Sequence, residues 1–200
     1  MGAKLEEAGF DPHRKASRLP PLPRPLDPIV ASLFENTLSR GGDILNLHLT
    51  NGQAPRLARA RRVFTIALRD ECACPRLDRE IAICRAALLV DCAYEWGHHL
   101  PLVKRAGLSE EQARALADWR GSASLFEPRH QALLAFVDQM CERKGVVEEA
   151  AFAELQTHYS PQEIVELANC ASTYYATGLY MKALGLIPDE PGRKAAPGSF

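Results

Sequence analysis

A thiol, a carboxylate and two imidazoles lie close together in the segment DCAYEWGHHL, residues 91–100. In a helix of about 3.6 residues per turn, Cys92, Glu95 and His99 are three and four positions apart and project from one face within about 60°. These three side chains could therefore serve one site. His98 points about 100° away from His99, so we expect it at a surface or an interface.

Each of these residues also has a purely structural interpretation. Glu95 and His99 could form an i,i+4 contact that stabilises the helix by a few tenths of a kcal/mol, and Cys92 could be a small buried apolar residue. Tyr94 and Trp96 would supply apolar walls that perturb the proton equilibria of both groups. The residues alone leave both the structural and the catalytic interpretation of His99 and Glu95 open.

Two charged residues upstream could join this site. Arg85 precedes Cys92 by two turns on nearly the same face, where its guanidinium could bind a substrate carboxylate with two hydrogen bonds. An ion pair with Asp91 or another structural acid explains Arg85 equally well. On one straight helix, Glu80 falls about 140° from Arg85 and about 60° from Glu95. Glu80 then reaches the site only if the helix is broken or a neighbouring chain contributes.

Helical signals dominate the elements that must position these residues. Prolines make residues 1–28 an extended arm, residues 29–187 read as one all-α domain, and residues 188–200, rich in Pro and Gly, should form a flexible tail. Caps and apolar periodicity predict about seven helices. Their expected ranges are 29–40, 55–70, 79–107, 109–119, 128–144, 147–157 and 160–184.

Composition narrows the class of protein. The 200 residues are 46% hydrophobic and 24% charged, which is typical of a globular domain. A formal charge of −1 argues against nucleic acid as a partner. No stretch reaches the roughly 18 apolar residues of a membrane span, and no signal pattern opens the chain. We expect a cytoplasmic protein with no membrane partner, in which the six cysteines are reduced thiols.

The stretch RLDREIAICRAALLVDCAYEWGHHLPLVKRAGLS resembles the carboxymuconolactone decarboxylase family, which includes the alkylhydroperoxidase AhpD. The resemblance rests on the Arg79-Glu80 pair, on Arg85, on the YEW-x-x-H motif of residues 94–99 and on the AGLS turn of residues 106–109. It implies an AhpD-like helical fold of about seven helices. It also implies a homo-oligomer, a trimer or a hexamer.

One departure from the peroxidase branch decides the chemistry that the resemblance implies. Glu95 stands where that branch has the second cysteine of its CxxC motif, so Cys92 has no disulfide partner there. The sequence is therefore similar to the decarboxylase branch. This implies a cofactor-free enzyme without a metal ion that acts by acid/base proton transfer on a small carboxylated lactone or related carbonyl compound.

In this hypothesis His99 is the acid/base, Glu95 fixes its tautomer or relays the proton, and Arg85 orients the substrate. Glu80 and Cys92 complete the catalytic set, and Tyr94 and Trp96 contact the substrate. Two alternatives stay open. One is a thiol peroxidase or disulfide reductase of the alkylhydroperoxidase type that uses Cys92, and the other is a non-catalytic helical assembly protein.

Overall fold

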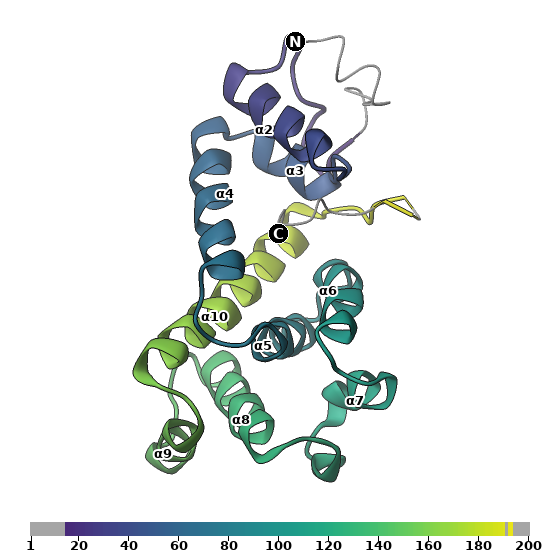
Figure 1. The fold of residues 1–200 in the computed structure, drawn as a ribbon. Coiled ribbons are helices and arrows are strands. Elements are labelled where there is room, and N and C mark those ends of the chain that lie inside the picture. The colour runs from purple at the N-terminus through teal and green to yellow at the C-terminus, as the bar shows by residue number, and fades with distance from the viewer. Residues whose placement is uncertain (1–14, 191, 194–200) are drawn as a thin grey trace. The chain divides into compact units, whose positions relative to one another are not determined.

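The computed structural model describes residues 15–190 and 192–193, and its only regular elements there are helices (Figure 1). The all-α prediction is thereby confirmed. The chain divides into two compact units. The terminal unit comprises the described residues of Met1–Glu71 and Met181–Phe200, and the central unit is Cys72–Tyr180. Among the described helices, none is long and apolar enough to cross a membrane.

Three helices of the terminal unit surround a small core of their own: α2 (Pro28–Ser39), α3 (Asn46–Gly52) and α4 (Pro55–Asp70). The side chain of Asp27 caps α2 by accepting a hydrogen bond from the Ile29 amide at 2.8 Å. The buried apolar side chains of this core are those of Ala16, Leu22, Val30, Phe34, Ile44 and Leu49. Because α3 is short and has no polar capping side chain, its signal in the sequence was too weak to predict it.

Both ends of the described chain form hydrogen bonds with other residues of the terminal unit. The amide of Arg18 donates to the Leu184 carbonyl at 2.9 Å, and the amide of Asn46 donates to Asp189 Oδ1 at 2.7 Å. The arm at 1–28, the single domain at 29–187 and the tail at 188–200 stay predictions. Residues 1–14 of the arm, and residues 191 and 194–200 of the tail, lie outside the described residues.

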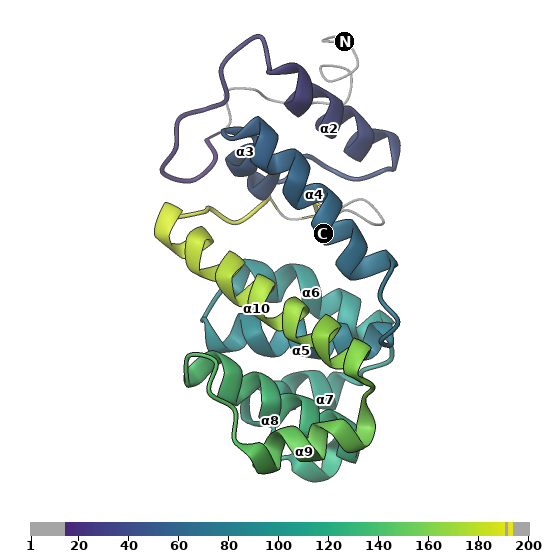
Figure 2. The same ribbon diagram turned by 90° about the vertical axis from the view of Figure 1, so that its left-hand side faces the viewer.

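The central unit is built around α5 (Arg76–Leu89), which packs against α6 (Ala93–Arg105) and α8 (Pro128–Glu142) (Figure 2). The remaining elements are α7 (Glu110–Ala115), the short 3-10 helices η1 (Leu116–Asp118) and η2 (Ala123–Leu125), α9 (Glu149–His158) and α10 (Pro161–Leu184). The fully buried core includes Ile81, Leu116, Leu133, Leu134, Leu155 and Leu167. Each such side chain contributes about 1.5–3 kcal/mol by its burial.

The helix expected at 79–107 is in fact two helices. Helix α5 ends at Leu89 with a Schellman motif, in which Cys92 N donates to the Ala87 carbonyl at 2.9 Å and Asp91 N donates to the Leu88 carbonyl at 3.0 Å. Asp91 takes the left-handed conformation, with φ of 51°. An aspartate in place of the usual glycine hid this helix end. With α3 added, the described residues contain nine α-helices rather than about seven.

Gly178 allows α10 to pack closely against this turn. A Cβ atom at residue 178 would lie 2.5 Å from Val90 Cγ1 and 3.1 Å from Cys92 Cβ. Atoms in ordinary contact are about 3.5–4.0 Å apart, so no larger residue fits without movement. The close approach places one face of α10 against the α5–α6 connection.

Candidate active site

The break between α5 and α6 brings Glu80 to His99. Nδ1 of His99 lies 2.8 Å from Oε2 of Glu80, and Nε2 of His99 lies 3.5 Å from Oε2 of Glu95. All three side chains are at most 1% exposed. One imidazole is thus held between two buried carboxylates, one from α5 and one from its own helix. We call Glu80, Glu95 and His99 the buried triad.

Two further residues contact the buried triad. Nη2 of Arg76, one turn before Glu80 on α5, lies 2.5 Å from Glu80 Oε1, and its side chain is 37% exposed. The ring of Tyr174 on α10 meets the His99 ring edge-on, with centroids 4.7 Å apart. An i,i+4 search could have found Arg76. Only the fold could identify Tyr174, which is far from the motif in sequence.

Burial and the neighbouring positive groups shift the pKa of Glu80 in opposite directions. Burial alone would raise its pKa, but the hydrogen bond and positive charge of His99, together with the guanidinium of Arg76, outweigh burial and hold the pKa below its ordinary value of 4.5. Glu80 is therefore ionised at neutral pH and accepts hydrogen bonds only. The proton on the Nδ1 side of His99 accordingly belongs to the imidazole.

The two cysteines near this region differ in position. Cys84, one turn after Glu80 on α5, is fully buried, and its pKa is raised by burial and by the charges of Glu80 and Glu95. It therefore stays a neutral thiol. Cys92 is 4% exposed and is the N-cap residue of α6. Cys92 thus precedes the helix that carries Glu95 and His99 instead of sharing a helical face with them.

Arg85 lies in a different polar cluster. Its Nε donates to Asp138 Oδ1 at 2.6 Å, and its Nη1 donates to the Leu116 carbonyl at 2.9 Å. Asp138 also accepts hydrogen bonds from Trp119 Nε1 at 3.0 Å and from Arg120 Nη2 at 3.1 Å. This cluster joins α5 to α8 and η1. The contacts of Arg85 agree with its structural interpretation, that of an arginine paired with a structural acid.

The two aromatic residues of the motif are half-buried. The ring of Tyr94 contacts the ring of His98 with centroids 4.7 Å apart, and Trp96 packs against the core of the central unit. Their predicted contact with a substrate stays a prediction. In the part of the chain that the structure describes, no cluster of three or more His, Cys, Asp or Glu residues could hold a metal ion.

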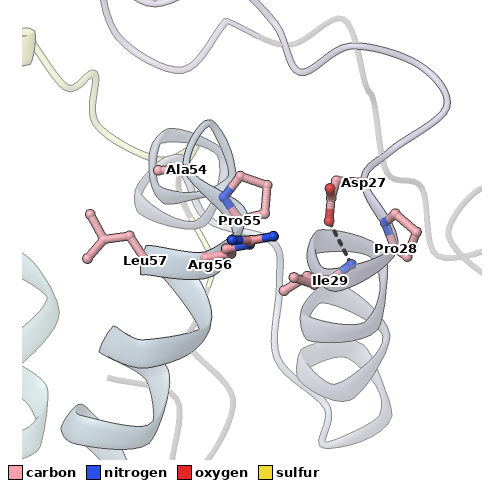
Figure 3. A pocket seen from close by; sticks show the side chains of 7 residues that line it. All are labelled: Asp27, Pro28, Ile29, Ala54, Pro55, Arg56 and Leu57. Carbon is pink, nitrogen blue, oxygen red and sulfur yellow. Dashed lines mark hydrogen bonds between the residues drawn. The ribbon is translucent and has the colours of Figure 1, made fainter.

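The terminal unit has a surface pocket where α2 and α4 begin (Figure 3). Its lining residues are Asp27, Pro28, Ile29, Ala54, Pro55, Arg56 and Leu57. None of the site residues predicted from the sequence lines this pocket. The Asp27 carboxylate, drawn beside the pocket, is already bonded to the Ile29 amide.

The fold is that of AhpD-like helical proteins. A peroxidase-related protein from Silicibacter sp. TM1040 matches with a TM-score of 0.76 at 19% identity, over 90% of this chain and 96% of that chain. An AhpD-core, peroxidase-related protein from Ralstonia eutropha JMP134 matches with a TM-score of 0.76 at 20% identity, over 88% and 94%. The debrominase Bmp8, solved with 2,3,4-tribromopyrrole, matches with a TM-score of 0.65 at 19% identity, over 90% and 94%.

Residues 55–138 match the carboxymuconolactone decarboxylase family. This match confirms the resemblance that the motif predicted, and it runs from α4 into α8, including the whole buried triad. No curated protein matches the sequence. The decarboxylase-type branch suggested by the YEW-x-x-H motif stays a prediction.

Proposed function

We propose that this protein is an acid/base enzyme, related to gamma-carboxymuconolactone decarboxylase, that acts on a small carboxylated lactone or a related carbonyl compound. The observation that carries the proposal is the position of the His99 imidazole, 2.8 Å from Glu80 and 3.5 Å from Glu95. A general acid/base needs a fixed tautomer and a group that exchanges protons with it. The buried triad supplies both.

The roles of the two carboxylates follow from which nitrogen each one faces. Glu80 accepts the Nδ1 proton and fixes the tautomer, a role that the sequence alone gave to Glu95. Nε2 then faces Glu95 across 3.5 Å. Two buried acceptors at that distance repel unless one of them carries a proton. His99 and Glu95 would therefore share the proton that is delivered to the substrate.

In a decarboxylation, the bond between the carboxylate carbon and its neighbour breaks, and the electron pair moves into the conjugated carbonyl of the substrate. Carbon dioxide leaves, and the pair returns to form a bond with the proton from His99 and Glu95. The same parts would support isomerisation or another lyase step. The tasks left to the protein are orientation, desolvation and proton delivery.

Arg76 is the best candidate for binding the substrate carboxylate. Its guanidinium adjoins the buried triad through Glu80, and more than a third of its side chain is exposed. Arg85 has its Nε and Nη1 donors engaged by Asp138 and by backbone carbonyls. An arginine beside the triad can bind a carboxylate with two hydrogen bonds.

The reaction is tested by incubating the purified protein with gamma-carboxymuconolactone in D₂O and following carbon dioxide release and product mass. The proposal expects stoichiometric carbon dioxide and one deuterium on the conjugated system from which the carboxylate left, at the carbon that lost it or at the carbon next to the carbonyl. Deuterium uptake without carbon dioxide would indicate isomerisation by the same triad. Neither carbon dioxide nor deuterium, over a panel of carboxylated lactones and keto acids, would contradict the proposal and favour a non-catalytic assembly protein.

A thiol peroxidase at Cys92 is the second candidate, because Cys92 is the N-cap residue of α6. The positive end of a helix dipole stabilises a thiolate. The thiolate would attack a hydroperoxide to give a sulfenic acid and an alcohol, and an external dithiol would reduce the sulfenic acid with release of water. Hydroperoxide consumption in the presence of dithiothreitol that is lost in Cys92→Ser, but kept in Cys84→Ser, would establish this activity.

A further inference from the structure

The central unit buries a guanidinium that lacks a carboxylate partner among the described residues. Arg79 is 7% exposed. Its Nη1 donates to the Cys72 carbonyl at 3.4 Å, and its Nε is buried without a hydrogen-bond partner. A buried charge without an opposite charge is strongly unfavourable. A nearby group that can become an anion would therefore offset the cost of burying the Arg79 guanidinium.

Three thiols gather beside this guanidinium. The carboxylate of Glu166 on α10 accepts hydrogen bonds from the Ala73 amide at 3.0 Å and from the Cys74 amide at 2.8 Å. This fixes the Cys72-Ala73-Cys74 segment against α10. Cys170 follows Glu166 by four residues, so it lies on the same face of that helix one turn further along. The segment and Cys170 are thus brought together by a contact independent of the YEW-x-x-H motif.

The charges of these groups act on one another. Burial raises the pKa of Cys170 to about 12, negative charges on Cys72, Glu80 and Glu166 raise it further, and Arg79 lowers it. For Cys74 too, burial is the largest cause of a raised pKa. Cys170, Glu166 and Cys72 raise it further, and only Arg79 lowers it. The three thiols and the guanidinium therefore form one electrostatically linked cluster.

The three thiols of this cluster differ in their exposure to solvent. Cys170 is fully buried and Cys74 is 2% exposed, whereas Cys72 is only half-buried. A small oxidant from solution therefore reaches Cys72 first. We propose that Cys72 and Cys170 form a second thiol centre, which hydroperoxides oxidise to an intramolecular disulfide. Arg79, whose Nη1 contacts the Cys72 carbonyl, places a positive charge beside the attacking residue.

The proposed oxidation of Cys72 and Cys170 proceeds in two steps. The Cys72 thiolate attacks the terminal oxygen of a hydroperoxide, the O–O bond breaks, and Cys72 becomes a sulfenic acid while the alkoxide takes a proton and leaves as an alcohol. The Cys170 sulfur then attacks the sulfenic sulfur and releases water. Two thiols are oxidised and one hydroperoxide is reduced to an alcohol and water. An external dithiol returns the centre to its reduced form.

The direct test maps the thiols of the full chain after one equivalent of cumene hydroperoxide, with remaining thiols blocked by iodoacetamide. Peptide mass spectrometry should show a Cys72–Cys170 disulfide that dithiothreitol removes. Cys141, which is also half-buried but pairs with no member of the cluster, is the internal control and should stay alkylated. Absence of a disulfide, equal oxidation of Cys141, or a Cys72–Cys74 disulfide would each overturn the assignment.

Two variants test the second step. Cys72→Ser should form no disulfide in this region. Cys170→Ser should instead leave a sulfenic acid on Cys72, which dimedone traps as a stable adduct. A dimedone adduct on Cys74 and none on Cys72 would contradict the role of Cys72 as the attacking thiol.

Arg79 is tested by its effect on the rate at which iodoacetamide alkylates Cys72. Arg79→Met should slow this rate at least about threefold, because thiolate is the reactive form, while the rate at Cys141 stays unchanged. Arg79→Lys keeps the charge and should retain most of the rate. A rate at Cys72 that is the same in all three proteins would overturn the role of Arg79.

The same variants distinguish this role from a structural one. Removing an uncompensated buried charge should leave the denaturation midpoint of Arg79→Met at or above that of the wild type. A clearly lower midpoint would contradict the conclusion that this guanidinium lacks a partner. Neither readout depends on the acid/base function, because no member of the buried triad is changed.

Discussion

Oε2 of Glu80 and Nδ1 of His99 are 2.8 Å apart although 19 residues separate them in sequence. The contact exists because α5 ends at Leu89 and α6 begins at Ala93, which folds the motif back on itself. Glu80 then faces one nitrogen of the imidazole while Glu95 faces the other. The acid/base hypothesis depends on this arrangement.

The lowered pKa of Glu80 predicts a dependence of stability on pH. Because the pKa in the folded state lies below 4.5, ionised Glu80 stabilises the fold above its ordinary pKa, and this stabilisation is lost as the pH falls through the folded pKa. Urea unfolding of the wild type at pH 7, 4 and 3 should show this loss. Glu80→Gln should show a smaller loss, whereas the exposed control Glu111→Gln should follow the wild type. Parallel curves for Glu80→Gln and wild type would contradict the cited shift.

The turn between α5 and α6 should be sensitive to residue 178. Gly178→Ala would place a methyl group 2.5 Å from Val90 Cγ1, and such overpacking typically destabilises by about 1–3 kcal/mol. The matched control is Gly97→Ala within α6, where a Cβ meets nothing within 4 Å; it should be neutral or stabilise by up to about 1 kcal/mol. Equal unfolding midpoints for the two variants would show that the turn does not need Gly178.

The cluster around Asp138 should affect stability. Asp138→Ala removes the acceptor of Arg85, Trp119 and Arg120, and breaking a buried ion pair typically costs about 3–5 kcal/mol. Arg120→Ala removes only the exposed partner, so its effect should stay below about 1 kcal/mol. Urea unfolding measures both variants. A change of less than about 1 kcal/mol for Asp138→Ala would return Arg85 to consideration as a substrate-binding residue.

The sequence predicted the elements that have strong local signals. Ser160 and Pro161 predicted the start of α10, and the capping box of Ser109 and Gln112 predicted α7; both are confirmed. The proximity of Glu95 and His99 followed from their i,i+4 spacing and is also confirmed. Local periodicity and capping determine such features, so one sequence is enough to find them.

Features that depend on tertiary contacts could not be predicted in this way. Asp91 in a left-handed conformation ended α5 without a glycine to mark the end, and only this break brings Glu80 to His99. Arg85 pairs with Asp138, 53 residues away in sequence. Tyr174 reaches His99 from α10. The homo-oligomer, expected as a trimer or hexamer, stays a prediction.

The most direct test of the acid/base hypothesis compares His99→Ala with His98→Ala. Both variants remove one imidazole from α6, but only His99 lies between the two carboxylates. The kcat/KM for the carboxylated lactone that the wild type turns over should fall about 10²- to 10⁴-fold in His99→Ala. It should stay within about threefold of wild type in His98→Ala. A His99→Ala enzyme that is folded and retains wild-type kcat/KM would contradict the hypothesis.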